Sequence, residues 1–129
     1  MRVMTTLLLI AISISGCKKD ESPTNTNQVA PVFYIDLQES FQHDSVRVSV
    51  DQNQVFVDTI TTIISLSLAK RVAPTVTSGP HAIKVEILNL NIHADTTVNV
   101  SDTTTLEVNY NRTSKNISFQ VLSFAPMYE

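Results

Sequence analysis

SVRVSVDQNQVFVDT, residues 45–59, is the stretch that decides the fold class. Val46, Val48 and Val50 alternate with polar or charged residues, and this period of two is typical of a strand with one buried face. The polar residues 51–54 interrupt the run and favour a turn, after which an apolar pattern resumes. The stretch therefore predicts a β-hairpin.

The same alternation recurs along the rest of the chain. It is found at 33–37, 64–68, 83–87, 98–100, 106–110 and 117–121. Helical spacing is nowhere sustained, although 63–72 would tolerate one turn of helix. The recurrence predicts an all-β, immunoglobulin-like antiparallel β-sandwich of about seven or eight strands over residues 31–129. The likeness is architectural only, because the chain lacks the cysteine pair and the core tryptophan of antibody domains.

Residues 1–16 have the layout of an export leader. Arg2 gives a positively charged start, 7–14 form an almost purely apolar run, and two small residues precede Cys17. A helix needs about 20 apolar residues to cross a bilayer, and this run is far shorter. The segment is therefore predicted to be a secretory leader that is removed, not a permanent membrane span.

Ile14-Ser15-Gly16-Cys17 resembles the lipobox of bacterial lipoproteins. The resemblance implies that the Cys17 thiol is diacylglycerylated, that the leader is cut before Cys17, and that the new amine receives a fatty acid such as palmitate. The alternative is cleavage by an ordinary signal peptidase, which would leave a free thiol. Cys17 is the only cysteine, so the mature chain is predicted to contain no internal disulfide.

Lys18-Lys19-Asp20-Glu21 follows directly and resembles the export signal that sends Bacteroidota lipoproteins to the cell surface. It implies a lipid-anchored protein of the outer membrane, displayed on the outside. A periplasm-facing anchor, with these charges only hydrating the start of the tether, is the alternative. Residues 17–30 are polar and contain proline, so they are predicted to be the lipidated cysteine and a flexible linker.

The charge balance excludes one class of partner. The chain has 9 Lys and Arg residues against 12 Asp and Glu residues. Arg2 is the only charged residue in 1–16, so removing the leader makes the remainder more acidic. Nucleic-acid binding requires clustered basic residues. The expected partners are therefore the membrane, through the lipid anchor, and a protein or glycan of the envelope, with no nucleic acid.

No catalytic or cofactor-binding pattern stands out. His43, His81 and His93 are scattered without the spacing of metal ligands, and are expected to be hydrogen-bonded surface histidines. The chain has no nucleophile-elbow motif, and its 2 glycines are too few for a phosphate-binding loop. The sequence therefore predicts a protein that is not an enzyme and that needs no cofactor or metal.

Two small groups of residues are candidates for contact or modification. Tyr34 and Tyr110 are the candidate platforms for a sugar ring, with a role in the core or at a strand edge as the alternative. Four Asp-Ser or Asp-Thr pairs are similar to the O-glycan acceptor pattern of Bacteroidota exported proteins. Their acceptors would be Ser45, Thr59, Thr96 and Thr103. The alternative is that each Asp simply ends a strand or turn.

These observations favour a non-catalytic function. We expect a surface lipoprotein of the outer membrane whose β-sandwich is a binding or structural accessory of the envelope. A glycan-binding module of a surface polysaccharide-uptake system is the alternative expectation.

Overall fold

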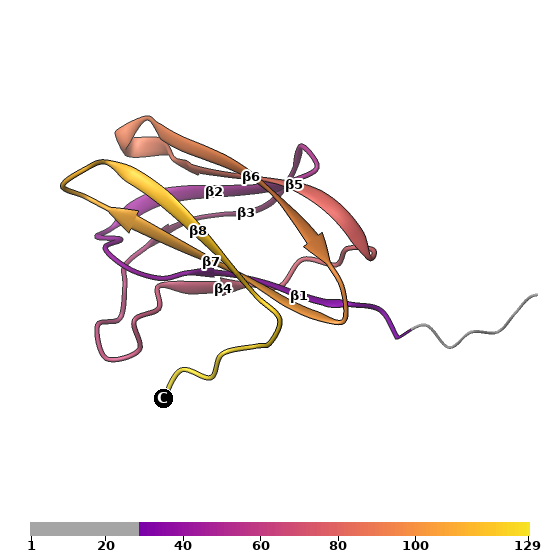
Figure 1. The fold of residues 1–129 in the computed structure, drawn as a ribbon. Helices are drawn as coiled ribbons and strands as arrows, with labels where there is room; N and C mark the ends of the chain where they lie inside the picture. The colour runs from indigo at the N-terminus through magenta and orange to yellow at the C-terminus, as the bar shows by residue number, and fades with distance from the viewer. Residues whose placement is uncertain (1–28) are drawn as a thin grey trace, which may run out of the picture.

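The structure is a computed structural model that describes residues 29–129, and this part of the chain forms a β-sandwich (Figure 1). It contains eight strands and one short 3-10 helix, η1. Their bounds are β1 Val32–Leu37, β2 Asp44–Val50, β3 Asn53–Ile60, β4 Lys70–Val72, β5 Gly79–Ile87, η1 Leu88–Leu90, β6 Ile92–Val100, β7 Thr103–Asn111 and β8 Asn116–Leu122. No helix within 29–129 is long and apolar enough to span a membrane.

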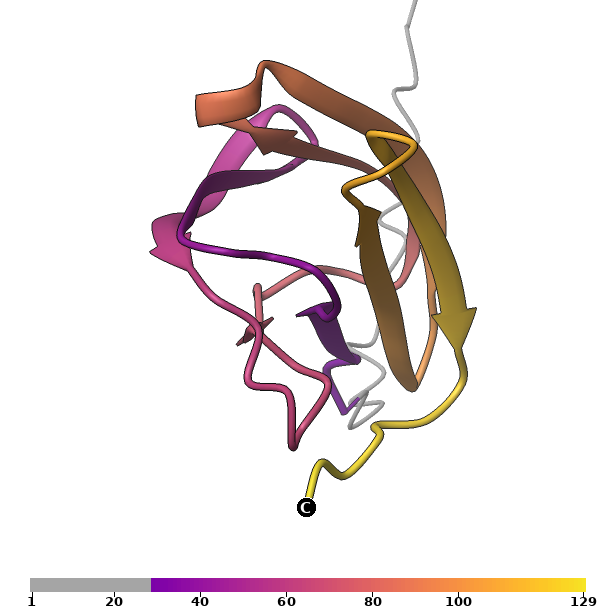
Figure 2. The same cartoon turned by 90° about the vertical axis from the view of Figure 1, so that its left-hand side faces the viewer.

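The strands form two sheets of four, with the orders β4-β1-β7-β8 and β3-β2-β5-β6. The two layers face each other in the two perpendicular views (Figures 1 and 2). This arrangement confirms the predicted all-β sandwich. Five of the six strand pairings are antiparallel, whereas β1 and β7 run parallel. The alternation within each strand carries no information about that parallel pairing.

The alternating pattern explains the core, because one side of each central strand faces the other sheet. In β2 every second residue is buried, and the three valines among these residues are register partners of buried residues of β5. Val46 is opposite Ile87, and Val48 is opposite Val85. From the other sheet, Ile35 and Leu106 are fully buried register partners. The apolar face of each sheet therefore packs against that of the other.

The region 64–68 differs from its prediction, because it is a turn rather than a strand. The backbone N–H of Leu66 bonds the carbonyl of Ile63 at 3.0 Å, and Ile63 and Leu68 form an isolated bridge. Ile64 is 91% exposed at the tip. The chain crosses here from β3 in one sheet to β4 in the other. Residues 64–68 therefore have no neighbouring strand to pair with, although their apolar and polar residues alternate.

The segment 70–80 is part strand and part irregular connection. It contains β4, whose three residues pair with the end of β1. Its remainder, 73–78, is a true connection that leads into β5. A three-residue strand gives too short an alternation to be recognised in the sequence.

Candidate functional site

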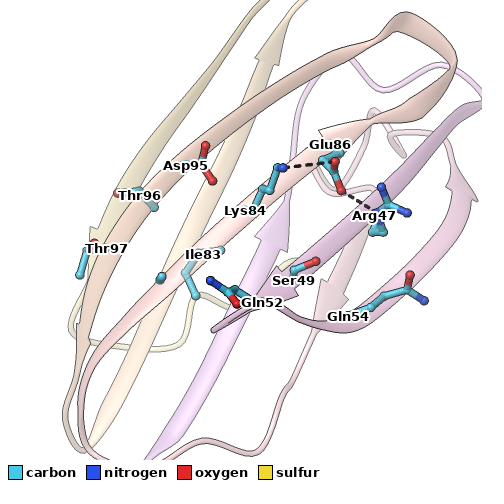
Figure 3. A pocket seen from close by; sticks show the side chains of 11 residues that line it. Arg47, Ser49, Gln52, Gln54, Ile83, Lys84, Glu86, Asp95, Thr96 and Thr97 are labelled. Atoms are coloured by element: carbon cyan, nitrogen blue, oxygen red, sulfur yellow. Dashed lines mark hydrogen bonds and ion pairs between the residues drawn. The ribbon is translucent and has the colours of Figure 1, made fainter.

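A polar hollow lies on the solvent-facing side of the β3-β2-β5-β6 sheet (Figure 3). We call it the trough; its volume is about 750 Å³. It runs across the strands, with Asp95 and Thr97 of β6 on one side, Ser49 of β2 in the middle and Gln54 of β3 on the other side. All four strands of this sheet therefore contribute to the lining.

Small residues at the centre of this sheet face create the hollow. Ser49 in β2 and Ala82 in β5 point outward, because the two residues that flank each of them in its strand are buried. Ser49 is the register partner of Lys84, and Ala82 is the register partner of Thr97. Short side chains surrounded by longer ones leave a depression in the sheet surface. The trough therefore follows from side-chain length at outward positions.

One end of the trough is closed by a charged network. Nε of Arg47 lies 2.6 Å from Oε2 of Glu86, and Nζ of Lys84 lies 3.6 Å from Oε1 of Glu86. The Arg47 hydrogen bond is the main reason that the pKa of Glu86 is lowered and that the pKa of Arg47 is raised. The Glu86 carboxylate is therefore ionised at neutral pH and is contacted by both Arg47 and Lys84.

The rest of the lining presents free hydrogen-bonding groups. Ser49, Gln52, Gln54, Asp95 and Thr97 make no side-chain hydrogen bond or ion pair with any other residue in 29–129. Hydroxyl and amide groups both donate and accept, and the Asp95 carboxylate accepts. These groups are consequently available to a ligand that brings both donors and acceptors.

The residue before Ala82 in β5 is a buried histidine, His81, on the opposite face of the sheet. Nδ1 of His81 lies 2.6 Å from Oδ2 of Asp51, and its Nε2 lies 2.7 Å from the carbonyl oxygen of Thr77. The backbone N–H of Ala82 donates to Oδ1 of Asp51 at 2.9 Å. Both ring nitrogens face acceptors, which is the arrangement of a doubly protonated ring. The expectation of a surface histidine is wrong here, because His81 is only 8% exposed.

The His81 contacts give a signed pH prediction. The hydrogen bond to Asp51 is the main cause that raises the pKa of His81 above 6.5, and the same bond lowers the pKa of Asp51 below 3.8. His81 therefore stabilises the fold fully below pH 6.5 and loses this contribution as the pH rises through its folded-state pKa. Asp51 loses its contribution only in acid, below pH 3.8.

We expect the urea midpoint of unfolding to fall as the pH is raised above about 6.5, because the His81 ring loses its proton as the pH rises through its raised folded-state pKa. His81→Gln should remove most of that fall. His93→Gln is the matched control, because His93 is exposed on β6 and makes no hydrogen bond within the described residues. A fall that persists unchanged in His81→Gln would contradict the assignment. The measurement is urea unfolding followed by circular dichroism.

Neither of the two tyrosines expected as sugar platforms presents a fully exposed ring. Tyr110 is only 3% exposed and packs against Phe41, with 6.1 Å between the ring centroids. Its proposed platform role is therefore corrected, and it has the core role given as the alternative. Tyr34 is half-buried, and the guanidinium carbon of Arg71 lies 4.4 Å from its ring centroid. Arg71 therefore covers one face of Tyr34.

The four candidate O-glycan acceptors lie in different surroundings. Thr59 is exposed and is the register partner of Ser45, which is half-buried on the same outward face. Thr96 and Thr103 are also half-buried. The Asp58 carboxylate accepts from the backbone N–H of Thr59 at 2.8 Å. This last contact gives Asp58 a local structural role, in line with the alternative that each Asp only shapes the backbone next to it.

The predicted anchoring residues fall outside the described part of the chain. Cys17, Lys18, Lys19, Asp20 and Glu21 all precede residue 29, as does the predicted leader. Within 29–129, no group of three or more His, Cys, Asp or Glu side chains is placed to hold a metal ion.

The described part of the protein is thus an eight-stranded β-sandwich with a polar trough on one sheet. Comparison with known proteins found no family model that matches this chain, and no curated protein sequence that matches it.

Proposed function

We propose that this protein is a lipid-anchored, non-catalytic binding accessory of the bacterial cell envelope, and that the trough is its binding surface. The observation that carries the binding role is the set of free donors and acceptors gathered around Ser49 in a hollow of about 750 Å³. Ligand sites are typically concave and carry a few polar groups that converge on the ligand. The proposed location is the outer membrane, with the sandwich displayed on the cell surface.

The proposed anchor is the acylated Cys17, supported by the lipobox resemblance and by the apolar run before it. Each buried CH₂ group contributes about 0.8 kcal/mol to membrane binding, and a single chain binds only marginally. Two or three chains on one residue would therefore hold the protein firmly. The residues between Cys17 and β1 would act as the tether.

Replacing Cys17 by serine tests the anchor. We expect more than about nine-tenths of the wild-type protein in the membrane fraction, and a shift of most of the Cys17→Ser protein to the soluble fraction or to the uncleaved precursor. Mass spectrometry of the wild-type amino-terminal peptide should find fatty acids on Cys17. Ser22→Ala leaves the lipobox intact and is the control. A native amino terminus without fatty acid would contradict the proposal.

Surface display has its own test. Protease treatment of intact cells should degrade the wild-type sandwich, and a variant with Lys19 and Asp20 replaced by alanine should be protected. The lipobox is unchanged in this variant, so its membrane fraction should not change. Protection of the wild-type sandwich would instead favour the periplasm-facing alternative.

A further inference from the structure

We propose that the trough binds an uncharged, hydroxyl-rich glycan, recognised by its hydroxyl groups rather than by stacking on aromatic rings. This inference names the ligand class for the binding role proposed above, but it does not depend on the lipid anchor. It also differs from the glycan site expected at Tyr34 and Tyr110, which lie on the other sheet.

The charges of the trough favour a ligand without net charge. The lining carries two cations, Arg47 and Lys84, and two anions, Glu86 and Asp95. Arg47 and Lys84 are both engaged by Glu86, so no group of free cations is left for a phosphate, sulfate or uronic acid. The remaining carboxylate, Asp95, stands alone, and one carboxylate is too few for a specific metal site.

The free groups of the trough favour a dense array of hydroxyls. Gln52 and Gln54 can each donate and accept through one amide, and the hydroxyls of Ser49 and Thr97 can do the same. The Asp95 carboxylate can accept two hydroxyl hydrogens at once. A sugar hydroxyl is also both donor and acceptor, so neighbouring hydroxyls on one ring match these side chains. The groups lie on both sides of the hollow, on the outer strands β3 and β6, so an oligosaccharide laid across the four strands would contact both sides (Figure 3).

The position of the trough argues against an extended peptide. Its floor is formed by β2 and β5, which each pair with a strand on both sides. Their backbone groups are therefore committed to the sheet, and a peptide laid across them would find no free strand edge to pair with. The ligand must be recognised by side chains alone.

The composition of the lining also sets the expected strength of binding. None of its residues is aromatic. A few hydrogen bonds exchanged with water give modest net affinity, so we expect a dissociation constant on the order of a millimolar for a short oligosaccharide. A long polysaccharide would be retained more strongly, because several anchored copies could contact the same chain.

Affinity electrophoresis of the intact, membrane-extracted protein tests the inference. The gels would contain mannan, xylan or a starch-type glucan, with polygalacturonate and a sulfated glycan as charged probes, and the detergent must carry no sugar headgroup. We expect at least one neutral polysaccharide to retard the protein. We do not expect the charged probes to retard it more strongly than the neutral ones. An array of neutral oligosaccharides extends the search beyond these probes.

Two trough variants and one control make the result specific. Ala82→Gln adds a longer uncharged side chain to the floor and should abolish retardation. Gln54→Ala removes one amide and should weaken binding about fivefold. Gln120→Ala is the matched control, because Gln120 is exposed on β8 of the other sheet and should have no effect. Unchanged circular dichroism spectra would show that all three variants fold.

Three results would overturn the inference. They are no retention by any neutral glycan, retention that Ala82→Gln leaves intact, and retention by charged glycans only. None of them bears on the membrane fractionation of Cys17→Ser, so the anchor and the ligand class fail separately. Binding by a protein that proves to carry no fatty acid would support the glycan and refute only the anchor.

Discussion

Replacing Arg71 by methionine should lower the free energy of unfolding by about 3–5 kcal/mol, because it leaves a buried carboxylate without its partner. Asp36 is 0% exposed. Nε of Arg71 donates to Oδ1 of Asp36 at 2.7 Å, and Nη2 donates to Oδ2 at 2.8 Å. This two-bond geometry is the strongest form of an arginine–carboxylate contact. Without it, the Tyr128 hydroxyl would be the one side-chain donor left to the Asp36 carboxylate among the described residues.

The carboxyl-terminal residues depend on the same contact. Nη2 of Arg71 also donates to the carbonyl oxygen of Pro126 at 2.9 Å, and the Tyr128 hydroxyl donates to Asp36 at 2.6 Å. Burial, together with the bond to Asp36, raises the pKa of Tyr128 to about 12. Loss of Arg71 should therefore also release residues 123–129 from the sheet. Limited proteolysis of the Arg71→Met protein should cut this segment first.

Arg47→Met is the matched control for Arg71→Met. The pair between Arg47 and Glu86 is as short, at 2.6 Å, but the Arg47 side chain is 38% exposed and lies on the solvent face. Exposed ion pairs contribute little to stability, so the free energy of unfolding should change far less in this variant than in Arg71→Met. Urea unfolding followed by circular dichroism would measure both. If the free energy of unfolding fell equally in the two variants, the pairing of Arg71 with the buried Asp36 would not be a special source of stability.

Asp36 also shows where prediction from the sequence ends. Phe33, Ile35 and Leu37 alternate with it, so the pattern assigns Asp36 to the exposed face of its strand, and it does lie on that outer face. It is buried nevertheless, because Arg71 and residues 123–129 cover it from positions far along the chain. Alternation assigns a residue to one side of a sheet, but it does not show what covers that side.

The trough, likewise, could be predicted only in part from the sequence. The outward positions of Ser49 and Lys84 follow from the period of two, and so does a turn after Val50, although the structure limits it to residues 51–52 because 53 and 54 already belong to β3. β3 and β4 lie between β2 and β5 in the chain, so the pairing of β2 with β5 depends on the assembled sandwich. The small residues at 49 and 82 become one hollow only once this register is fixed. The contact between Asp51 and His81 was missed for the same reason, since 30 positions separate them.

Phe41→Ala should lower the free energy of unfolding by about 3–5 kcal/mol, although Phe41 belongs to no strand. Phe41 lies in the connection between β1 and β2, yet only 1% of its surface is exposed. Its ring packs against Tyr110 of β7, and its backbone N–H donates to the hydroxyl oxygen of Thr62 at 3.1 Å. Removing the ring would leave a cavity at this end of the core, because the two sheets hold its walls apart.

Phe124→Ala is the control for Phe41→Ala, because it removes a phenylalanine ring that is not part of the core. Phe124 follows β8 and is 56% exposed, so its removal should change stability by no more than about 0.5 kcal/mol. Phe41→Leu should lose less than Phe41→Ala, because leucine fills part of the same space. Urea midpoints measured for the three variants should therefore fall in the order Phe124→Ala, Phe41→Leu, Phe41→Ala. If Phe41→Ala unfolds at the same urea concentration as Phe124→Ala, the Phe41 ring does not close this end of the core. The connection between β1 and β2 would then be a surface loop, and the strands alone would account for the stability of the sandwich.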